Sequence, residues 1–200
     1  MPRPSVEAER KEQILAAACT VLADKGFTAL RIADVAKEIG TSTGTVHYYF
    51  DTKRDLTTAA FEWNFARSLE RRQHILDLHD DPRSELRAFV ESYLPTDEET
   101  VRAWHVWAEL WVEALHDAEL ARLNERVYGA WRTIVRSIIE HGQRVGHFRA
   151  GDPTSMANAL ISMIDGLSLQ VLLGSEQLGV DQMRAVCDQA LASFDVPVAT

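Results

Sequence analysis

The sequence contains few cysteines and no long apolar run. Its two cysteines, Cys19 and Cys187, lie far apart within apolar helical patterns, which predicts buried thiols rather than a disulfide framework. No stretch of about 18 consecutive apolar residues occurs, which argues against a membrane span. Residues 1–12 are charged and lack the apolar segment of a signal peptide. We therefore expect a soluble, cytoplasmic protein that does not enter the membrane.

Two motifs of common enzymes are missing as well. The sequence has no G-x-x-x-x-G-K phosphate loop and no H-E-x-x-H zinc motif. His105, Glu109 and Glu113 are spaced at i, i+4 and i+8, but no cysteine or second histidine completes a tetrahedral metal site at the usual spacing. A solvated or pocket-lining face is the better interpretation of this row. We therefore expect no catalytic residues, no metal and no cofactor.

The acidic charge of the chain is unevenly distributed. The formal net charge is −9, from 21 basic and 30 acidic residues. Residues 1–55 hold eight of each sign, so the remaining 13 basic and 22 acidic residues carry the whole excess. Phosphate would be repelled by the acidic part and tolerated by the neutral one. If the chain binds nucleic acid, it does so through its N-terminal part.

Residues 31–53, RIADVAKEIGTSTGTVHYYFDTK, have the pattern of two short helices joined by a tight turn. Ile32, Val35, Ala36 and Ile39 follow the i, i+3, i+4, i+7 spacing of one apolar helix face. This spacing predicts the first of the two helices.

A glycine and a serine mark the turn and the start of the second helix. Gly40 suits the left-handed conformation that ends a helix, and Ser42 suits the first cap of a helix over residues 43–49. Val46 and Phe50 remain to pack inward. The outward side chains can form hydrogen bonds and are Thr43, Thr45, His47 and Tyr48. A short helix with an apolar back and a hydrogen-bonding front is typical of DNA recognition.

Apolar residues at helical spacing predict an all-α protein of about nine helices, with no strand pattern of useful length. Caps are expected at Thr52 with Asp55, at Asp81-Pro82, at Thr96 with Glu99 and at Asp152-Pro153. Gly26 ends the first helix, and Gly142 and Gly146 end the seventh. The remaining helices are expected at about 7–25, 52–78, 82–94, 97–115, 117–145, 153–173 and 180–194.

The last two predicted helices, 153–173 and 180–194, are apolar on more than one side. Such a helix is buried on more than one side. Either they form a central core within one chain, or they pair with a second copy in a four-helix bundle. A DNA-reading head favours the second interpretation, because such heads usually work as symmetric dimers.

Residues 13–56, from ILAAACTVLADKGF to the lysine-led helix after the aromatic pair, resemble the TetR family of bacterial transcriptional regulators. The segments WHVWAELW, YGAWRTIV, GHF and DGL are similar to the C-terminal domain of its choline-responsive BetI-like branch. The resemblance implies an all-helical homodimer with a helix-turn-helix DNA-binding domain at 1–52 and an effector-binding and dimerisation domain at 53–200. Dimerisation would use the helices at about 153–173 and 180–194.

The resemblance also implies a function. Such a dimer would place its recognition helices about 34 Å apart on a near-palindromic double-stranded DNA operator and block transcription. A small-molecule effector would shift the fourth helix and release the DNA. Within the family, an activator or a repressor without an effector stays open. Outside it, the alternative is a helical ligand carrier or an enzyme.

Family contacts can be transferred to individual positions of this sequence. Phosphate contacts would fall on Ser42, Tyr49 and Lys53. Base-edge contacts would fall on Thr43, Gly44, Thr45 and either His47 or Tyr48. Two positions depart from the family. Leu30-Arg31 replaces the frequent Thr-Thr, so Arg31 would supply a charged phosphate contact, and position 47 is histidine where tyrosine is common.

An aromatic stripe of Trp104, Trp107 and Trp111 is expected on the sixth helix, with Tyr128 and Trp131 on the seventh. Aromatic rings attract cations, and carboxylates at Glu109, Glu113 or Asp165 would add charge, so a cationic effector is one hypothesis. The other is that the stripe is ordinary core. Asp165-Gly166 also fits helix packing at a dimer face.

Overall fold

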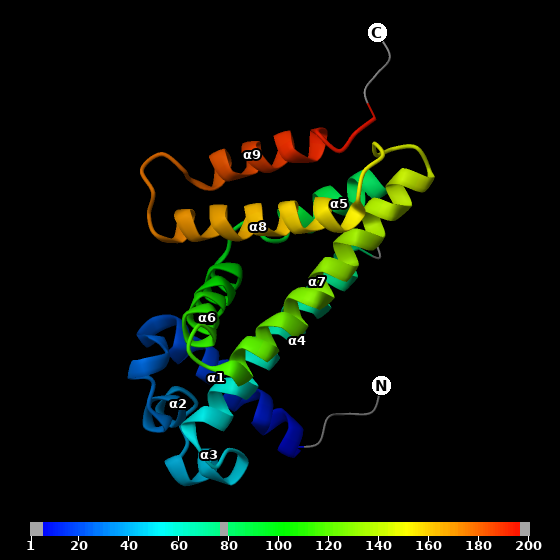
Figure 1. Ribbon diagram of the computed structural model, residues 1–200. Coiled ribbons are helices and arrows are strands. Elements are labelled where there is room, and N and C mark those ends of the chain that lie inside the picture. The colour runs from blue at the N-terminus through cyan, green and yellow to red at the C-terminus, as the bar shows by residue number, and fades with distance from the viewer. Residues whose placement is uncertain (1–5, 77–79, 197–200) are drawn as a thin grey trace. The chain divides into compact units, whose positions relative to one another are not determined.

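The structure is a computed structural model that describes residues 6–76 and 80–196 (Figure 1). Nine α-helices account for most of these described residues, which confirms the all-α class. The predicted end of the fourth helix near residue 78 lies outside them. The helices are α1 Val6–Ala29, α2 Ile32–Glu38, α3 Thr43–Tyr49, α4 Lys53–Leu76, α5 Pro82–Glu91, α6 Glu98–Ala114, α7 Ala118–Arg144, α8 Pro153–Leu172 and α9 Val180–Ala192.

The chain forms two compact units. The first holds residues up to Ser68 together with Arg102–Asn124, and the second holds Leu69–Val101 together with the chain from Glu125 onward. Helices α4, α6 and α7 each contribute residues to both units. The expected division at residues 52 and 53 concerns function and stays a prediction.

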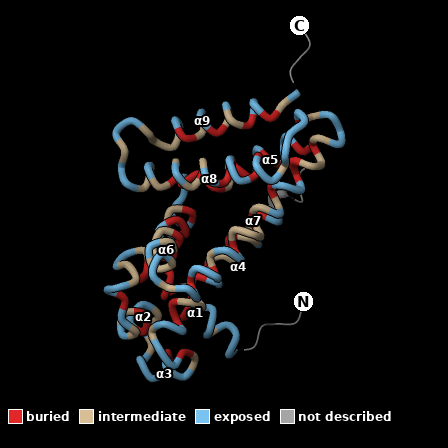
Figure 2. Tube along the Cα trace, in the orientation of Figure 1, coloured by how far each residue is buried: buried red, intermediate tan, exposed pale blue. Residues whose placement is uncertain are grey.

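The first unit contains the helices α1, α2 and α3, which pack in sequence against one another. Their apolar faces are buried, with Ile14, Val35 and Val46 fully enclosed (Figure 2). α1 leaves helical geometry at Gly26, where φ is 77° and ψ is 167°. Gly40 follows α2 with φ of 62°. Both glycines have the positive φ expected of them, because this region is strained for residues with a Cβ. Gly40 ends α2 as predicted, whereas Gly26 only kinks α1, which continues to Ala29.

The second unit contains α5, α8 and α9; α9 contacts both α5 and α8. The caps predicted for α5 and α8 are confirmed: the Asp81 carboxylate accepts from the Ser84 N–H at 3.0 Å, and the Asp152 carboxylate from the Ser155 N–H at 3.0 Å. Each is followed by a proline in the first turn, where its missing N–H is harmless.

The cap predicted for α6 at Thr96 is wrong. Asp97 caps this helix instead, since its carboxylate accepts from the Thr100 N–H at 2.9 Å and the Thr100 hydroxyl at 2.8 Å. A charged acceptor one residue later forms the stronger bonds. The end of α7 is also corrected, because Gly142 lies inside the helix. The Phe148 ring lies against it, and an added Cβ would be 2.0 Å from the ring.

Helix α8 is unusually apolar for its position. Its mean hydropathy of 1.2 and its 20-residue length would allow it to cross a membrane, although no run of 18 uninterrupted apolar residues occurs. A core or interface helix meets the same two criteria. Within the chain, one third of the residues in the most apolar 18-residue stretch of α8 are buried. A single copy of the chain therefore leaves much of α8 accessible.

Candidate nucleic-acid interface

Helix α3 begins at a hydrogen-bonded serine cap. The Ser42 Oγ accepts from the Thr45 N–H at 3.1 Å, and the two hydroxyl oxygens are 3.0 Å apart. Ser42 itself has extended backbone angles, as expected for a residue just before a helix. Val46 and Phe50 are buried, so the predicted inward packing of the helix is confirmed. The apolar face of α3 therefore packs against the rest of its unit.

The front of α3 is open to solvent. Thr43, Gly44 and His47 are exposed, and Tyr48 is 75% exposed. Tyr49 is half-buried, and its ring meets the Tyr48 ring edge-on at 5.0 Å between centroids. A tyrosine exposed to this degree contributes little to packing. The aromatic pair therefore presents its outer ring to whatever approaches this face.

The interior of the unit does not require a glycine at position 44. A Cβ added at Gly44 would meet only the Ser42 Oγ, at 3.6 Å, which is ordinary van der Waals contact. The space beside this residue is open toward the exposed front of α3. The absence of a side chain here thus lets an external molecule approach the backbone.

Two basic residues frame α2 and α3. Arg31 is exposed, stands just before α2 in extended geometry, and makes no cap bond with its side chain. Lys53 starts α4; its ammonium donates to the Thr28 carbonyl at 3.0 Å and lies 5.1 Å from the centre of the Phe27 ring. An ammonium has three N–H groups, so two remain for an anion.

Two other basic residues of this unit already have carboxylate partners. Arg54 pairs with Asp117 and with Glu119, the latter at 3.0 Å. The Arg54 hydrogen bond is the largest cause that lowers the pKa of Asp117 to about 2. Lys25 pairs with Asp34 at 2.8 Å. Because these partners are distant in sequence or on another helix, a count of the basic residues in the sequence could not identify them.

The tryptophan stripe of α6 is mostly core. Trp104 and Trp107 are buried; the Trp104 ring meets the Trp111 ring at 6.2 Å, and Phe65 of α4 meets Trp107 at 6.4 Å. Glu109 turns its carboxylate to the backbone and accepts from the Phe27 N–H at 2.6 Å. In the first unit, the predicted ligand residues Trp104 and Trp107 therefore pack in the core, and Glu109 links α6 to the end of α1.

The other predicted effector residues, Tyr128, Trp131 and Asp165, belong to the second unit. The Tyr128 hydroxyl donates to the Asp165 carboxylate at 2.6 Å. Burial raises the pKa of Asp165 to about 6, partly offset by this hydrogen bond. Burial also raises the pKa of Tyr128. Trp131 is buried beside Tyr93, with 5.7 Å between the ring centres.

A cation from the chain itself already lies against the second aromatic group. The guanidinium carbon of Arg72 is 3.5 Å from the centre of the Tyr93 ring and 5.7 Å from that of Trp131. One guanidinium N–H group donates to the Ser92 carbonyl at 2.9 Å. Burial lowers the pKa of Arg72. Sequence reasoning missed this residue, since it lies on a largely polar stretch of α4.

The residues 40–44, Gly-Thr-Ser-Thr-Gly, also match the G-x-S-x-G spacing of a hydrolase nucleophile elbow. That motif requires a strand before the serine and a histidine base. Here the helix α2 precedes Ser42, whose hydroxyl caps α3. Among the described residues, no three His, Cys, Asp or Glu side chains are grouped to hold a metal ion.

Comparisons with known proteins agree with this arrangement. The family model for the C-terminal part of BetI-type transcriptional repressors matches residues 82–195, and that for the tetR family of bacterial regulatory proteins matches 14–60. The regulator BetI of Stenotrophomonas maltophilia is 30% identical over 192 residues, which cover 93% of each chain.

Solved structures agree as well. A transcriptional regulator from Saccharomonospora viridis in complex with choline has a TM-score of 0.89 and 33% identity, covering 95% of this chain and 99% of that one. A TetR-family regulator from Rhodococcus has a TM-score of 0.83 and 26% identity, covering 94% and 99%. These relatives are transcriptional regulators, which places the chain in a non-enzymatic, DNA-binding role. The chain belongs to the BetI-type branch of the tetR family of bacterial transcriptional regulators.

Proposed function

We propose that this regulator is a cytoplasmic repressor that binds a near-palindromic DNA operator as a homodimer and releases it when a small effector binds. Residues 1–52 form the DNA-binding domain, with Lys53 at the start of the next domain also contacting DNA, and residues 53–200 bind the effector and a second copy. The observation that carries the proposal is helix α3, whose apolar back is buried while its front of hydrogen-bonding side chains is exposed. This is the form of a helix that enters the major groove.

The DNA contacts divide into two groups. Phosphates bind where charge or hydroxyl groups frame the helix, and bases bind along its exposed front. The phosphate-binding residues are Arg31, Ser42, Tyr49 and Lys53. The base-reading residues are Thr43, Gly44, Thr45, His47 and Tyr48. The open space beside Gly44 supports close approach of the backbone to a base edge.

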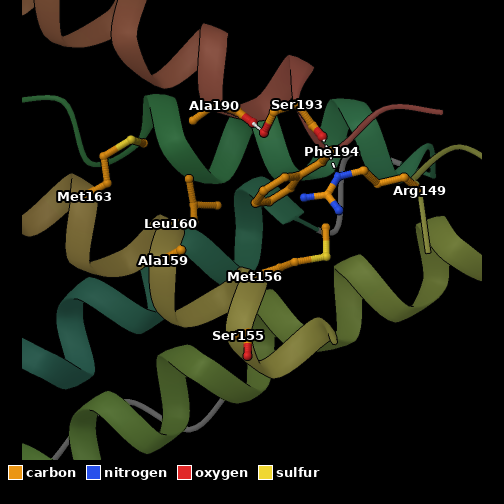
Figure 3. A pocket seen from close by; sticks show the side chains of 9 residues that line it. All are labelled: Arg149, Ser155, Met156, Ala159, Leu160, Met163, Ala190, Ser193 and Phe194. Atoms are coloured by element: carbon orange, nitrogen blue, oxygen red, sulfur yellow. Dashed lines mark hydrogen bonds between the residues drawn. The ribbon is translucent and has the colours of Figure 1, made fainter. Parts of the chain in front are cut away.

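The dimer forms through the segments 153–173 and 180–194. Ala159, Ser162 and Gly166 lie exposed on α8, and a Cβ added at Gly166 would meet nothing within 4 Å. Small residues let two helices approach closely. Beside this face a hollow of about 370 Å³ lies between α8 and α9 (Figure 3). Its lining is largely apolar and includes Met156, Leu160, Met163 and Phe194. A second copy would cover this surface.

The effector is a cation held near Asp165. This carboxylate is largely buried, and no Lys, Arg or His of the described residues forms an ion pair with it. A buried carboxylate without a counter-charge is unfavourable, so a cationic ligand beside it would be stabilised. Tyr128 and Trp131 would supply aromatic faces. The choline in the Saccharomonospora viridis relative supports this chemistry.

The DNA proposal is tested by selecting bound duplexes from a random pool and measuring affinity for the selected sequence at several salt concentrations. We expect a near-palindromic site and an affinity that falls steeply as salt rises, because phosphate contacts release counterions. A ligand carrier or an enzyme would bind no DNA at any salt concentration. That result, obtained with folded protein, would overturn the proposal.

The effector proposal is tested with choline, betaine aldehyde and polyamines. We expect at least one to raise the melting temperature of the protein and to release the selected duplex at the same concentration. Ligand binding to the native state alone stabilises it by mass action. If no cation shifts the melting temperature, the effector is not cationic. In vitro transcription from the selected site distinguishes repression from activation.

A further inference from the structure

The last turn of α1, which includes Gly26 to Thr28, is held by two other helices of the same unit. From α6, the Glu109 Oε2 accepts from the Phe27 N–H at 2.6 Å. From α4, the Lys53 ammonium donates to the Thr28 carbonyl at 3.0 Å and lies 5.1 Å from the centre of the Phe27 ring. Consecutive residues of one turn therefore contact an acid and a base that lie 56 positions apart in the sequence.

Gly26 makes room for the Glu109 carboxylate. A Cβ at this position would be 3.2 Å from both carboxylate oxygens, which is tighter than ordinary contact. The φ of 77° also disfavours any residue with a Cβ. The short bond to Phe27 joins a carboxylate to a backbone N–H, which is stronger than a bond between neutral groups. The absence of a side chain at Gly26 thus leaves the space that the Glu109 carboxylate occupies. Neither residue belongs to the exposed front of α3.

The same turn determines where the Lys53 ammonium lies. One of its three N–H groups is used on the Thr28 carbonyl, and the Phe27 ring lies beneath it. A lysine side chain is long and flexible, so these two contacts reduce the conformational freedom it would lose on binding phosphate. Movement of the turn would move the ammonium.

We infer that Glu109 is a positioning residue of the DNA-binding surface: through the Phe27 N–H it holds the turn that places the Lys53 ammonium for a phosphate. The inference rests on the proposed function, in which Lys53 binds phosphate. It gives α6 a connection to the DNA-binding residues besides α4. Because Glu109 lies on α6 between Trp107 and Trp111, movement of this helix by an effector would pull the carboxylate from the turn.

The test uses the full-length chain and a fluorescein-labelled 30-base-pair duplex of the sequence selected by the wild-type protein. Affinity is measured by anisotropy at several salt concentrations for Lys53→Ala, Glu109→Ala, Glu109→Asp and Glu109→Gln. We expect Glu109→Ala and Glu109→Asp to bind about tenfold more weakly and to flatten the salt slope by about one unit. Glu109→Gln keeps an oxygen that accepts from Phe27 and should stay close to wild type.

The charge of Glu109 cannot explain such a loss. Removing an acidic residue reduces repulsion of DNA, so Glu109→Ala would by charge alone strengthen binding. Glu109→Asp keeps the charge and only shortens the side chain. Glu113→Ala removes an acid one turn along α6 and serves as the matched control; we expect no loss of affinity and no change in slope.

A double variant tests whether Glu109 acts through Lys53. If it does, Lys53→Ala combined with Glu109→Ala binds no more weakly than Lys53→Ala alone, because the same phosphate contact is already lost. Losses that multiply, or a Glu109→Ala slope equal to wild type, would overturn the inference. Melting temperatures identify variants that fail to fold, in which case Glu109→Asp and Glu109→Gln carry the comparison.

The outcomes also separate this inference from the function on which it rests. Absence of DNA binding by the wild-type protein would contradict the proposed function. Normal wild-type binding that is weakened by Lys53→Ala, but unchanged by Glu109→Ala and Glu109→Asp, would contradict the inference alone.

Discussion

At the scale of single residues, Thr45 and Lys53 each contact another residue of the chain and also keep a group available for an external contact. The Thr45 hydroxyl lies 3.0 Å from the Ser42 hydroxyl, which leaves its methyl group for an outside contact. Lys53 lies against the end of α1 while two N–H groups stay available. The Thr45 methyl group is suited to reading a base, and the Lys53 ammonium is suited to binding any phosphate. Variants of the two residues should therefore affect DNA binding differently.

We expect Thr45→Ala to reduce sequence preference. Loss of the methyl contact should cost about 1 kcal/mol on the selected site and little on a scrambled duplex of equal length. Competition binding between the two duplexes measures the difference. Lys53→Ala provides the comparison, because it should weaken binding to both duplexes alike. Equal losses on both for Thr45→Ala would contradict a base-reading role.

Asp165 should make stability depend on pH. Its folded pKa of about 6 lies above the ordinary value of 3.8, so the folded state holds the proton more tightly than the unfolded state. The stabilisation is complete below about pH 4 and is lost as the pH rises through about 6. Asp165→Asn, which cannot ionise, should therefore be more stable than wild type at pH 7.5 by up to about 3 kcal/mol.

Urea unfolding of Asp165→Asn and wild type at pH 7.5 and pH 4.5 measures this effect. The difference in unfolding free energy should shrink toward zero at the lower pH. A difference of the same size at both pH values would show that ionisation of Asp165 does not contribute. Glu176→Gln, which removes an exposed carboxylate from the segment between α8 and α9, is the control for a change of charge alone.

At the scale of elements, short-range signals determined where most helices begin and end. The first turns of α3, α5 and α8 have the predicted serine or aspartate caps, because the residue that satisfies a free N–H lies two or three positions away. The cap of α6 shows the limit of this reasoning. Thr96 and Asp97 are adjacent and both are suitable cap residues, and the charged carboxylate of Asp97 forms the stronger bonds.

Removal of the α6 cap should therefore affect stability in a position-specific way. Asp97→Ala leaves the Thr100 N–H without its acceptor and should lower the unfolding free energy by about 1 kcal/mol. Thr96→Ala should have little effect, since its hydroxyl makes only a 3.4 Å contact with the Leu94 carbonyl. Urea denaturation of both variants at neutral pH makes the comparison. A larger loss for Thr96→Ala would contradict this assignment.

At the scale of the whole molecule, the exposed part of α8 is the surface that we propose a second copy covers. One third of the residues in the most apolar 18-residue stretch of this helix are buried within the chain. The small residues Ala159, Ser162 and Gly166 are exposed on it. A charge placed there should prevent a second copy from docking. We expect Ser162→Glu to convert a dimer to a monomer in light scattering after size exclusion, and to weaken binding to the selected duplex.

The control for Ser162→Glu adds the same charge elsewhere. Gln177 is exposed in the segment between α8 and α9, so Gln177→Glu should remain dimeric. A Ser162→Glu variant that stays dimeric would place the interface on another surface. A monomer that binds the duplex as tightly as wild type would contradict the need for a dimer on DNA.

The sequence by itself determined the helical class, the recognition motif and the family, because each depends on neighbours within about one helical turn or on a short spaced pattern. Only the tertiary structure decided which distant groups meet. It paired Tyr128 with Asp165, placed Arg72 over Tyr93, paired Arg54 with Asp117, and brought the Glu109 carboxylate to the Phe27 N–H. These pairs are 20 or more positions apart, so no local periodicity reports them. They depend on how the helices pack, which is governed by the burial of all their apolar faces at once.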